Sequence, residues 1–141
     1  FISTKNMVFE RLVKRLCLPA KISKRMRLDR EHFFKARFSL NEGGGLKPSE
    51  VYSIFSKLSS EAVVLLLADG YSERVIRYAT LYFNQYNKLA KTQLKGADLL
   101  EMGVEPGPVF DDIFRTLRDA RVDGQVTSRD EEVVLVVSHF L

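Results

Sequence analysis

The stretch "KGADLLEMGVEPGPVFDDIFRTLRDARVDGQV", residues 95–126, decides the fold class of this 141-residue chain. It contains two of the four prolines, in Pro106-Gly107-Pro108, between two apolar patterns with helical spacing. Proline suits a first helical position and glycine a residue just past a helix end. The stretch therefore predicts a short helix from about Gly96 to Met102, a rigid turn, and a longer helix over 108–122 that Gly124 closes. No catalytic group is obvious within it.

Most of the remaining chain also has helical periodicity. Pro19 ends a first helix or begins the next, and Gly70 stops a short buried one. Ser128-Arg-Asp-Glu131 is a capping box, so the run Val133–Val137 is assigned to a helix despite its strand propensity. Further helices are expected over residues 6–16, 20–38, 48–58, 59–70 and 73–91. The sequence predicts an all-α multi-helix bundle of about seven to nine helices with the Pro-Gly-Pro helix–turn–helix near the C-terminus.

The helix expected over 73–91 is rich in aromatic residues, and Ser72 is its predicted N-cap. Tyr78 falls off its apolar stripe and is considered for stacking on nucleic-acid bases. Core packing is the expectation for the residues on that stripe: Val75, Ile76, Ala79, Tyr82, Phe83, Tyr86 and Leu89.

The segment "NEGGGLKP", residues 41–48, has the composition of a loop, because three successive glycines lose too much entropy inside a helix. It predicts a basic N-terminal helical subdomain over 1–40 and a helical body and tail over 46–141. The apolar runs Ala62–Ala68 and Val133–Val137 are far shorter than the roughly 20 residues that span a bilayer, so no membrane is expected. The first residue, Phe1, suggests a piece of a longer protein.

The single cysteine, Cys17, excludes an internal disulfide framework and favours a reducing, cytoplasmic setting. It could serve as a nucleophile, but its place beside the apolar stripe of the first helix favours a buried, inert thiol.

The net charge of +4 conceals a strong asymmetry. Residues 1–37 hold 11 Lys and Arg against three acidic residues, a net charge of +8. Residues 98–132 hold ten acidic residues against four Arg, a net charge of −6. A molecule with this dipole could present its basic end to a phosphate backbone.

No catalytic or metal-binding motif is present in the sequence. There is no phosphate-binding loop, and His32 and His139 have no partner at the spacing of zinc ligands, so both are expected to be ordinary boundary or surface residues. Neighbouring helical residues point about 100° apart, so Asp111 and Asp112 are expected to stabilise a helix N-terminus rather than to chelate a metal ion. We therefore expect no metal or catalytic site in this chain.

The basic end is a candidate phosphate-binding surface. Lys21, Lys24 and Arg25 share one helix face through i, i+3, i+4 spacing, which suits a phosphate backbone, although a solvated helix face is the ordinary alternative. The candidate RNA-binding cations of this segment are Lys21, Lys24, Arg25, Arg27, Arg30, Lys35 and Arg37.

"KGADLLEMGVEPGP" with "IFRTLRDARVDGQVTSRDEE" resembles the C-terminal part of bacterial tRNA nucleotidyltransferases and poly(A) polymerases. Residues 46–68 also resemble the helical body of that family, particularly of its long multidomain members. The matching positions are Gly96, Asp98, Leu99, Gly103, Pro106, Gly107, Pro108, Leu117, Ala120, Asp123, Gly124, Arg129, Glu131 and Glu132.

The resemblance implies a larger enzyme whose catalytic head holds a metal site with Mg²⁺ and whose neck helix reads ATP or CTP. Neither pattern occurs in this chain, so we expect no cofactor within it. The body and tail of the family clasp the acceptor and T arms of tRNA, which makes tRNA or another structured RNA the expected partner, together with the rest of a longer polypeptide.

Within that resemblance, the Pro-Gly-Pro turn has two readings. Gly107, and Lys95 before the first helix, could let a phosphate approach free backbone N–H groups, or the turn could only fix the angle between two packed helices. Where family members often have glycine after this turn, the chain has Val109-Phe110-Asp111-Asp112, and two carboxylates would repel a phosphate. The expected RNA contact therefore moves toward residues 21–37.

The first functional hypothesis is a tRNA-binding C-terminal region that lacks the catalytic head and is inactive alone. The alternative is a non-enzymatic helical module that forms a homodimer or holds neighbouring domains together.

Overall fold

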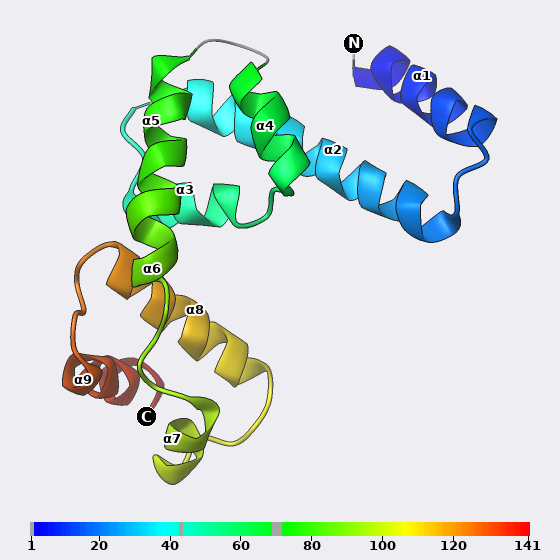
Figure 1. Cartoon of the computed structure of the whole chain (residues 1–141). Coiled ribbons are helices and arrows are strands. Elements are labelled where there is room, and N and C mark those ends of the chain that lie inside the picture. The colour runs from blue at the N-terminus through cyan, green and yellow to red at the C-terminus, as the bar shows by residue number, and fades with distance from the viewer. Residues whose placement is uncertain (1, 43, 69–71) are drawn as a thin grey trace.

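The computed structural model describes residues 2–42, 44–68 and 72–141, and it confirms an all-α architecture over them (Figure 1). The predicted glycine stop at Gly70 lies outside the described residues. The elements are α1 (Ile2–Arg15), α2 (Ala20–Asn41), α3 (Pro48–Phe55), α4 (Ser60–Ala68), α5 (Glu73–Leu81), the π-helical turn η1 (Tyr82–Tyr86), α6 (Asn87–Leu89), α7 (Gly96–Glu101), α8 (Pro108–Val122) and α9 (Arg129–Phe140).

A first hydrophobic core joins the C-terminal half of α2 to α3, α4 and α5. Leu40, Val51 and Phe55 are its most deeply buried members. Tyr82 of η1 stacks on Phe55 with 5.3 Å between ring centroids. Ala36 and Leu40 of the predicted N-terminal subdomain thus pack with residues from beyond the glycine loop, while the boundary between 1–40 and 46–141 stays a prediction.

A second core is formed by α7, α8 and α9 around Leu94, Leu99, Ile113, Leu117 and Val136, each at most 1% exposed. The two cores are connected, because α3 packs on α8 and Asp123 accepts hydrogen bonds from the N–H and the hydroxyl of Ser49, both at 2.8 Å.

The N-terminal cap of α9 forms as the sequence predicts. The side chain of Ser128 accepts from the N–H of Glu131, whose carboxylate accepts in turn from the N–H of Ser128. The predicted helix over Val133–Val137 lies within α9 and is confirmed.

The prediction of one continuous α-helix over 73–91 is wrong, because the π-helical turn η1 separates α5 from α6. A π turn adds a residue relative to a continuous α-helix and rotates later side chains around the axis. Phe83 and Leu89, expected to face inward, are 53% and 43% exposed. Ser72 occupies the N-cap position of α5, but its side chain makes no capping hydrogen bond.

The N-terminal half of α2 projects away from the first core, and α1 lies beyond it at the edge of the molecule (Figure 1). We call residues 6–37 of these two helices the basic hairpin. Pro19 is the N-cap of α2, and Val13 is the one buried residue among the described side chains of α1. Cys17 is exposed, with φ of +48°, so the expectation of a buried thiol is wrong: the turn between the helices carries it outside their interface.

Over the described residues, no single helix has both the length and the apolar composition to cross a membrane. Only α3 and α4 taken together pass such a test, and they are bent by 111° relative to each other.

Candidate nucleic-acid interface

Three of the predicted cations lie on the outer face of the projecting half of α2. Lys21, Lys24 and Arg25 are exposed, as their helical spacing predicts. Arg25 is 3.7 Å from Asp29 one turn later, and its side chain stays 70% exposed. These three residues, which we call the α2 triad, place exposed positive charge where a phosphate backbone can reach it.

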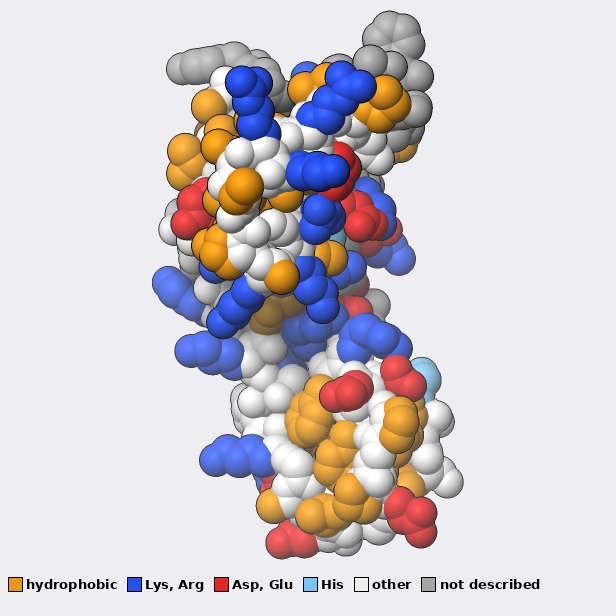
Figure 2. All heavy atoms as spheres, turned by 90° about the vertical axis from the view of Figure 1, so that its right-hand side faces the viewer, with side chains coloured by type: hydrophobic (Ala, Val, Ile, Leu, Met, Phe, Trp, Pro, Cys, Tyr) orange, Lys and Arg blue, Asp and Glu red, His pale blue; other side chains and the backbone are white. Residues whose placement is uncertain are grey.

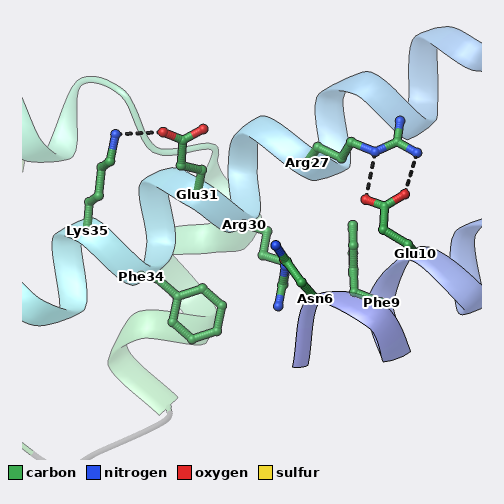
Figure 3. A pocket seen from close by; sticks show the side chains of 8 residues that line it. All are labelled: Asn6, Phe9, Glu10, Arg27, Arg30, Glu31, Phe34 and Lys35. Atoms are coloured by element: carbon green, nitrogen blue, oxygen red, sulfur yellow. Dashed lines mark hydrogen bonds and ion pairs between the residues drawn. The ribbon is translucent and has the colours of Figure 1, made fainter. Parts of the chain in front are cut away.

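Arg27 instead connects the two helices of the basic hairpin. Its Nε and Nη2 donate to the two carboxylate oxygens of Glu10 at 2.9 and 2.8 Å, a bidentate pair (Figure 3). This hydrogen bonding by Arg27 lowers the pKa of Glu10, and the same interaction raises the pKa of Arg27. Arg27 therefore holds α1 against α2 and is already engaged by an acid.

Arg30 and Lys35 have partners as well. Arg30 donates to the side-chain oxygen of Asn6, and its guanidinium carbon lies 4.7 Å from the centroid of the Phe9 ring and 5.3 Å from that of Phe34. Lys35 pairs with Glu31 at 2.6 Å and lowers its pKa. Arg37 is exposed farther along α2.

A cavity of about 630 Å³ opens between α1 and α2 (Figure 3). Its walls include Phe9, Arg30 and Phe34, with the Arg27–Glu10 and Lys35–Glu31 pairs at its margins. The sequence interpretation missed it. The one available signal is that Phe34 lies four and seven residues after Arg30 and Arg27, hence on their helix face.

Lys95 and Gly107, the candidates at the helix–turn–helix, are not brought to the basic hairpin: Figure 1 shows the start of α8 at the opposite end of the molecule from α1. Lys95 is the N-cap of α7, and its N–H donates to Asp98 at 2.6 Å. Gly107 has extended backbone, and a Cβ added to it would meet no atom within 4 Å. Asp111 and Asp112 are exposed in the following turn, and Asp112 pairs with Arg115.

Other residues matched by the resemblance have structural roles. The carboxylate of Glu132 is 0% exposed and accepts from the N–H groups of Gln93 and Leu94, the latter at 2.7 Å, and from Arg121 at 2.8 Å. Asp98 pairs with Arg129 at 2.8 Å. Gly103 and Gly124 have φ of +86° and +74°, in the left-handed region that favours glycine.

The proposed stacking role of Tyr78 is wrong. Its ring is only 6% exposed and belongs to the first core, and its hydroxyl accepts from the N–H of Leu46 at 3.2 Å. The helix register turns this side chain inward, while Phe83, assigned to the core by the sequence, is exposed.

Charge is segregated over the surface. Figure 2 shows Lys and Arg side chains gathered over the upper and middle parts of one face, while its lower part carries acidic side chains around an apolar patch. Among the described residues, no group of three or more His, Cys, Asp and Glu is arranged to hold a metal ion. The described surface of the basic hairpin offers cations and aromatic rings.

Comparison with known proteins gives one informative relative. The A-adding tRNA nucleotidyltransferase of Geobacter sulfurreducens is 30% identical over 92 residues, which are 65% of this chain and 10% of that protein. The similarity supports a relationship to the tRNA nucleotidyltransferase family. The chain corresponds to about a tenth of the relative's length. No family model and no solved structure matches it.

Proposed function

We propose that this chain is an RNA-binding, C-terminal helical region of a longer tRNA nucleotidyltransferase or poly(A) polymerase-like protein, and that the α2 triad binds the phosphate backbone of tRNA or a similarly structured RNA. The observation that carries the proposal is the exposure of Lys21, Lys24 and Arg25 on one face of a projecting helix. Fixed cations of this kind bind nucleic acid by releasing counterions condensed on the phosphates.

The similarity to an A-adding tRNA nucleotidyltransferase supports tRNA as the class of ligand. In this proposal, nucleotide transfer and its Mg²⁺ and ATP or CTP belong to a catalytic head outside the chain, and the whole protein acts in the cytoplasm. The acidic surface of α7–α9 repels phosphate and directs the RNA toward the basic hairpin.

The test is a fluorescence-anisotropy titration of a labelled tRNA at two salt concentrations. The variant Lys21→Glu/Lys24→Glu/Arg25→Glu reverses the triad. The matched control, Lys47→Glu/Lys88→Glu/Lys91→Glu, reverses three exposed lysines outside the hairpin and changes the net charge equally.

If the triad binds phosphates, its reversal weakens binding at least tenfold. It also makes the negative slope of log K against log salt shallower, by about 0.7–0.9 for each phosphate that the triad no longer neutralises. The control changes both much less. Equal losses in the two variants would mean a general charge effect and would contradict the assignment to α2.

A second candidate function is supported by an exposed apolar stripe on α9. Val134 and Val137 are three residues apart on α9 and are 66% and 50% exposed, and Leu141, which follows the helix, is 62% exposed. Such a stripe favours a module that dimerises or holds a neighbouring domain. In this case, salt-insensitive self-association that Val134→Glu/Val137→Glu abolishes, with no tRNA binding at low salt, is the expected result.

A further inference from the structure

The cavity between α1 and α2 has the size and the walls of a site for a small planar group. Its volume of about 630 Å³ falls within the ordinary range of ligand pockets, roughly 300–1,000 Å³. Figure 3 shows side chains from both helices around it, so the site exists only when α1 lies against α2.

The walls combine aromatic rings with a guanidinium plane. Phe34 is 43% exposed, although its ring lies against the Arg30 guanidinium on one side and packs edge-to-face on Phe33. Proteins hold unpaired nucleobases by stacking them on such rings and guanidinium planes, because every base has a π-face. An exposed phenyl ring among cations is thus suited to a base more than to an aliphatic ligand.

The charges at the margins also suit a base that is attached to a phosphate chain. Both acids of the cavity are ion-paired, Glu10 with Arg27 and Glu31 with Lys35, so neither presents an uncompensated carboxylate to an anion. Lys24 and Lys35 are eleven residues apart and share a side of α2. A strand bound along the α2 triad can therefore reach the cavity with its phosphates beside cations.

We propose that the cavity between α1 and α2 takes one unpaired nucleobase of an RNA strand whose phosphates lie on the α2 triad. The inference rests on the proposed RNA-binding function and adds a second mode of recognition to it. Phosphate binding alone accepts a duplex and a single strand alike, whereas a base site prefers RNA with an unstacked base.

The experiment couples a protein change to an RNA change. Phe34→Leu keeps an apolar side chain and removes the ring. Phe38→Leu is the matched control, because Phe38 lies one turn later on α2, is 63% exposed and does not line the cavity. The probes are a fluorescein-labelled single-stranded RNA, the same strand with every base replaced by an abasic site, and a blunt RNA duplex.

We expect Phe34→Leu to weaken binding of the intact single strand about 5- to 160-fold, the usual range for losing one stacked base. The Phe34→Leu variant binds the abasic strand and the duplex with the same affinity as the unmodified chain. Phe38→Leu changes none of the three affinities, and circular dichroism shows the same helix content in all proteins.

The inference is overturned if Phe34→Leu binds the intact strand as tightly as the unmodified chain does, or if it weakens the intact and abasic strands equally. In those outcomes, salt-dependent binding that requires the α2 triad leaves the proposed function standing. If the unmodified chain binds none of the three RNAs at low salt, the proposed function fails as well.

Discussion

The basic hairpin and the α7–α9 region are built in opposite ways. In the α7–α9 region, five apolar core side chains are at most 1% exposed, and the buried carboxylate of Glu132 is satisfied by two backbone N–H groups and Arg121. In the hairpin, Val13 is the buried apolar residue of α1's described side chains, while Val8 and Leu12 are 62% and 49% exposed. Polar contacts across water-exposed surface join its two helices.

This difference separates the residues that carry the family resemblance from those proposed to bind RNA. The α7–α9 region is held together by hydrogen bonds of Asp98, Glu131 and Glu132. Its turns contain Gly103 and Gly124, both with positive φ. The α2 triad and Phe34 remain accessible on the surface of the hairpin. The residues of α7–α9 that match the family therefore stabilise the fold. Replacing them does not directly alter the surface that we propose for RNA binding.

The largest loss of stability is expected when Glu132 is replaced. Replacing it by Gln removes the charge that pairs with Arg121 and one of the two acceptor oxygens, which leaves buried partners unsatisfied. We expect the free energy of unfolding to fall by about 3–5 kcal/mol, as for other broken buried ion pairs. Urea denaturation measures it.

Glu101→Gln is the control, because Glu101 is exposed on α7 and has no ion pair in the described structure; a change within about 0.5 kcal/mol is expected there. Equal, small effects of both variants would contradict the role of Glu132 as the centre of this region.

The turn glycines give a smaller effect. Gly103→Ala and Gly124→Ala force a side chain into the left-handed region and should each cost about 1–2 kcal/mol. Gly107→Ala should cost no more than about 0.5 kcal/mol, since its backbone is extended and space for a Cβ is open. Thermal unfolding of the three variants checks the order.

The same glycine series tests the Pro-Gly-Pro turn as an RNA contact. If Gly107→Ala keeps full stability but loses tRNA affinity, a phosphate approaches this turn, and the proposed restriction of RNA to the basic hairpin is wrong.

A fall in pH should weaken the helix caps of α7 and α9. The N–H of Lys95 and then Arg129 lower the pKa of Asp98 below its usual 3.8, and the N–H groups of Thr127 and Ser128 lower that of Glu131 below 4.5. Depressed carboxyl pKa values contribute stability that is present above the unfolded-state pKa and lost as pH falls through the folded-state pKa. Stability should thus decline from about pH 5 downward.

The variant Asp98→Asn/Glu131→Gln should show a shallower decline when urea midpoints are compared between pH 7 and pH 3. An unchanged pH profile would mean that these two carboxylates do not contribute to acid sensitivity.

The smallest effect on global stability is expected at the hairpin. Glu10→Gln breaks the bidentate pair with Arg27, which is exposed to water, so the unfolding midpoint should hardly move. Hydrogen exchange should nevertheless become faster in α1 and stay the same in α9. Unchanged exchange in α1 would show that the pair does not hold the hairpin together.

Much of the fold is local in origin and could be predicted. The box of Ser128 and Glu131, the proline that begins α8 and the apolar periodicities all act within a few residues. The hydrogen bonds of Glu132 reach 39 residues back along the chain, so no local pattern reveals them. Tyr78 points inward because of how its helix packs, and Leu89 is exposed because of the π turn. Hydrophobic periodicity in the sequence encodes neither feature.

The candidate site divides in the same way. The exposed triad follows from helical spacing, because residues three and four apart share a face. The pairing of Arg27 and Arg30 with residues of α1, and the cavity beside Phe34, require the placement of one helix against another. Seven cations on α2 were therefore candidates from the sequence, and the structure shows that Arg27, Arg30 and Lys35 are engaged by other side chains.

The most direct test of the comparison is a map of backbone amide NMR shifts in this chain as tRNA is added. Our account predicts perturbations concentrated in residues 6–37, around Lys21, Lys24 and Phe34, with α7–α9 unchanged. Perturbations centred on residues 103–112, with the basic hairpin silent, would contradict it and return the RNA contact to the Pro-Gly-Pro turn.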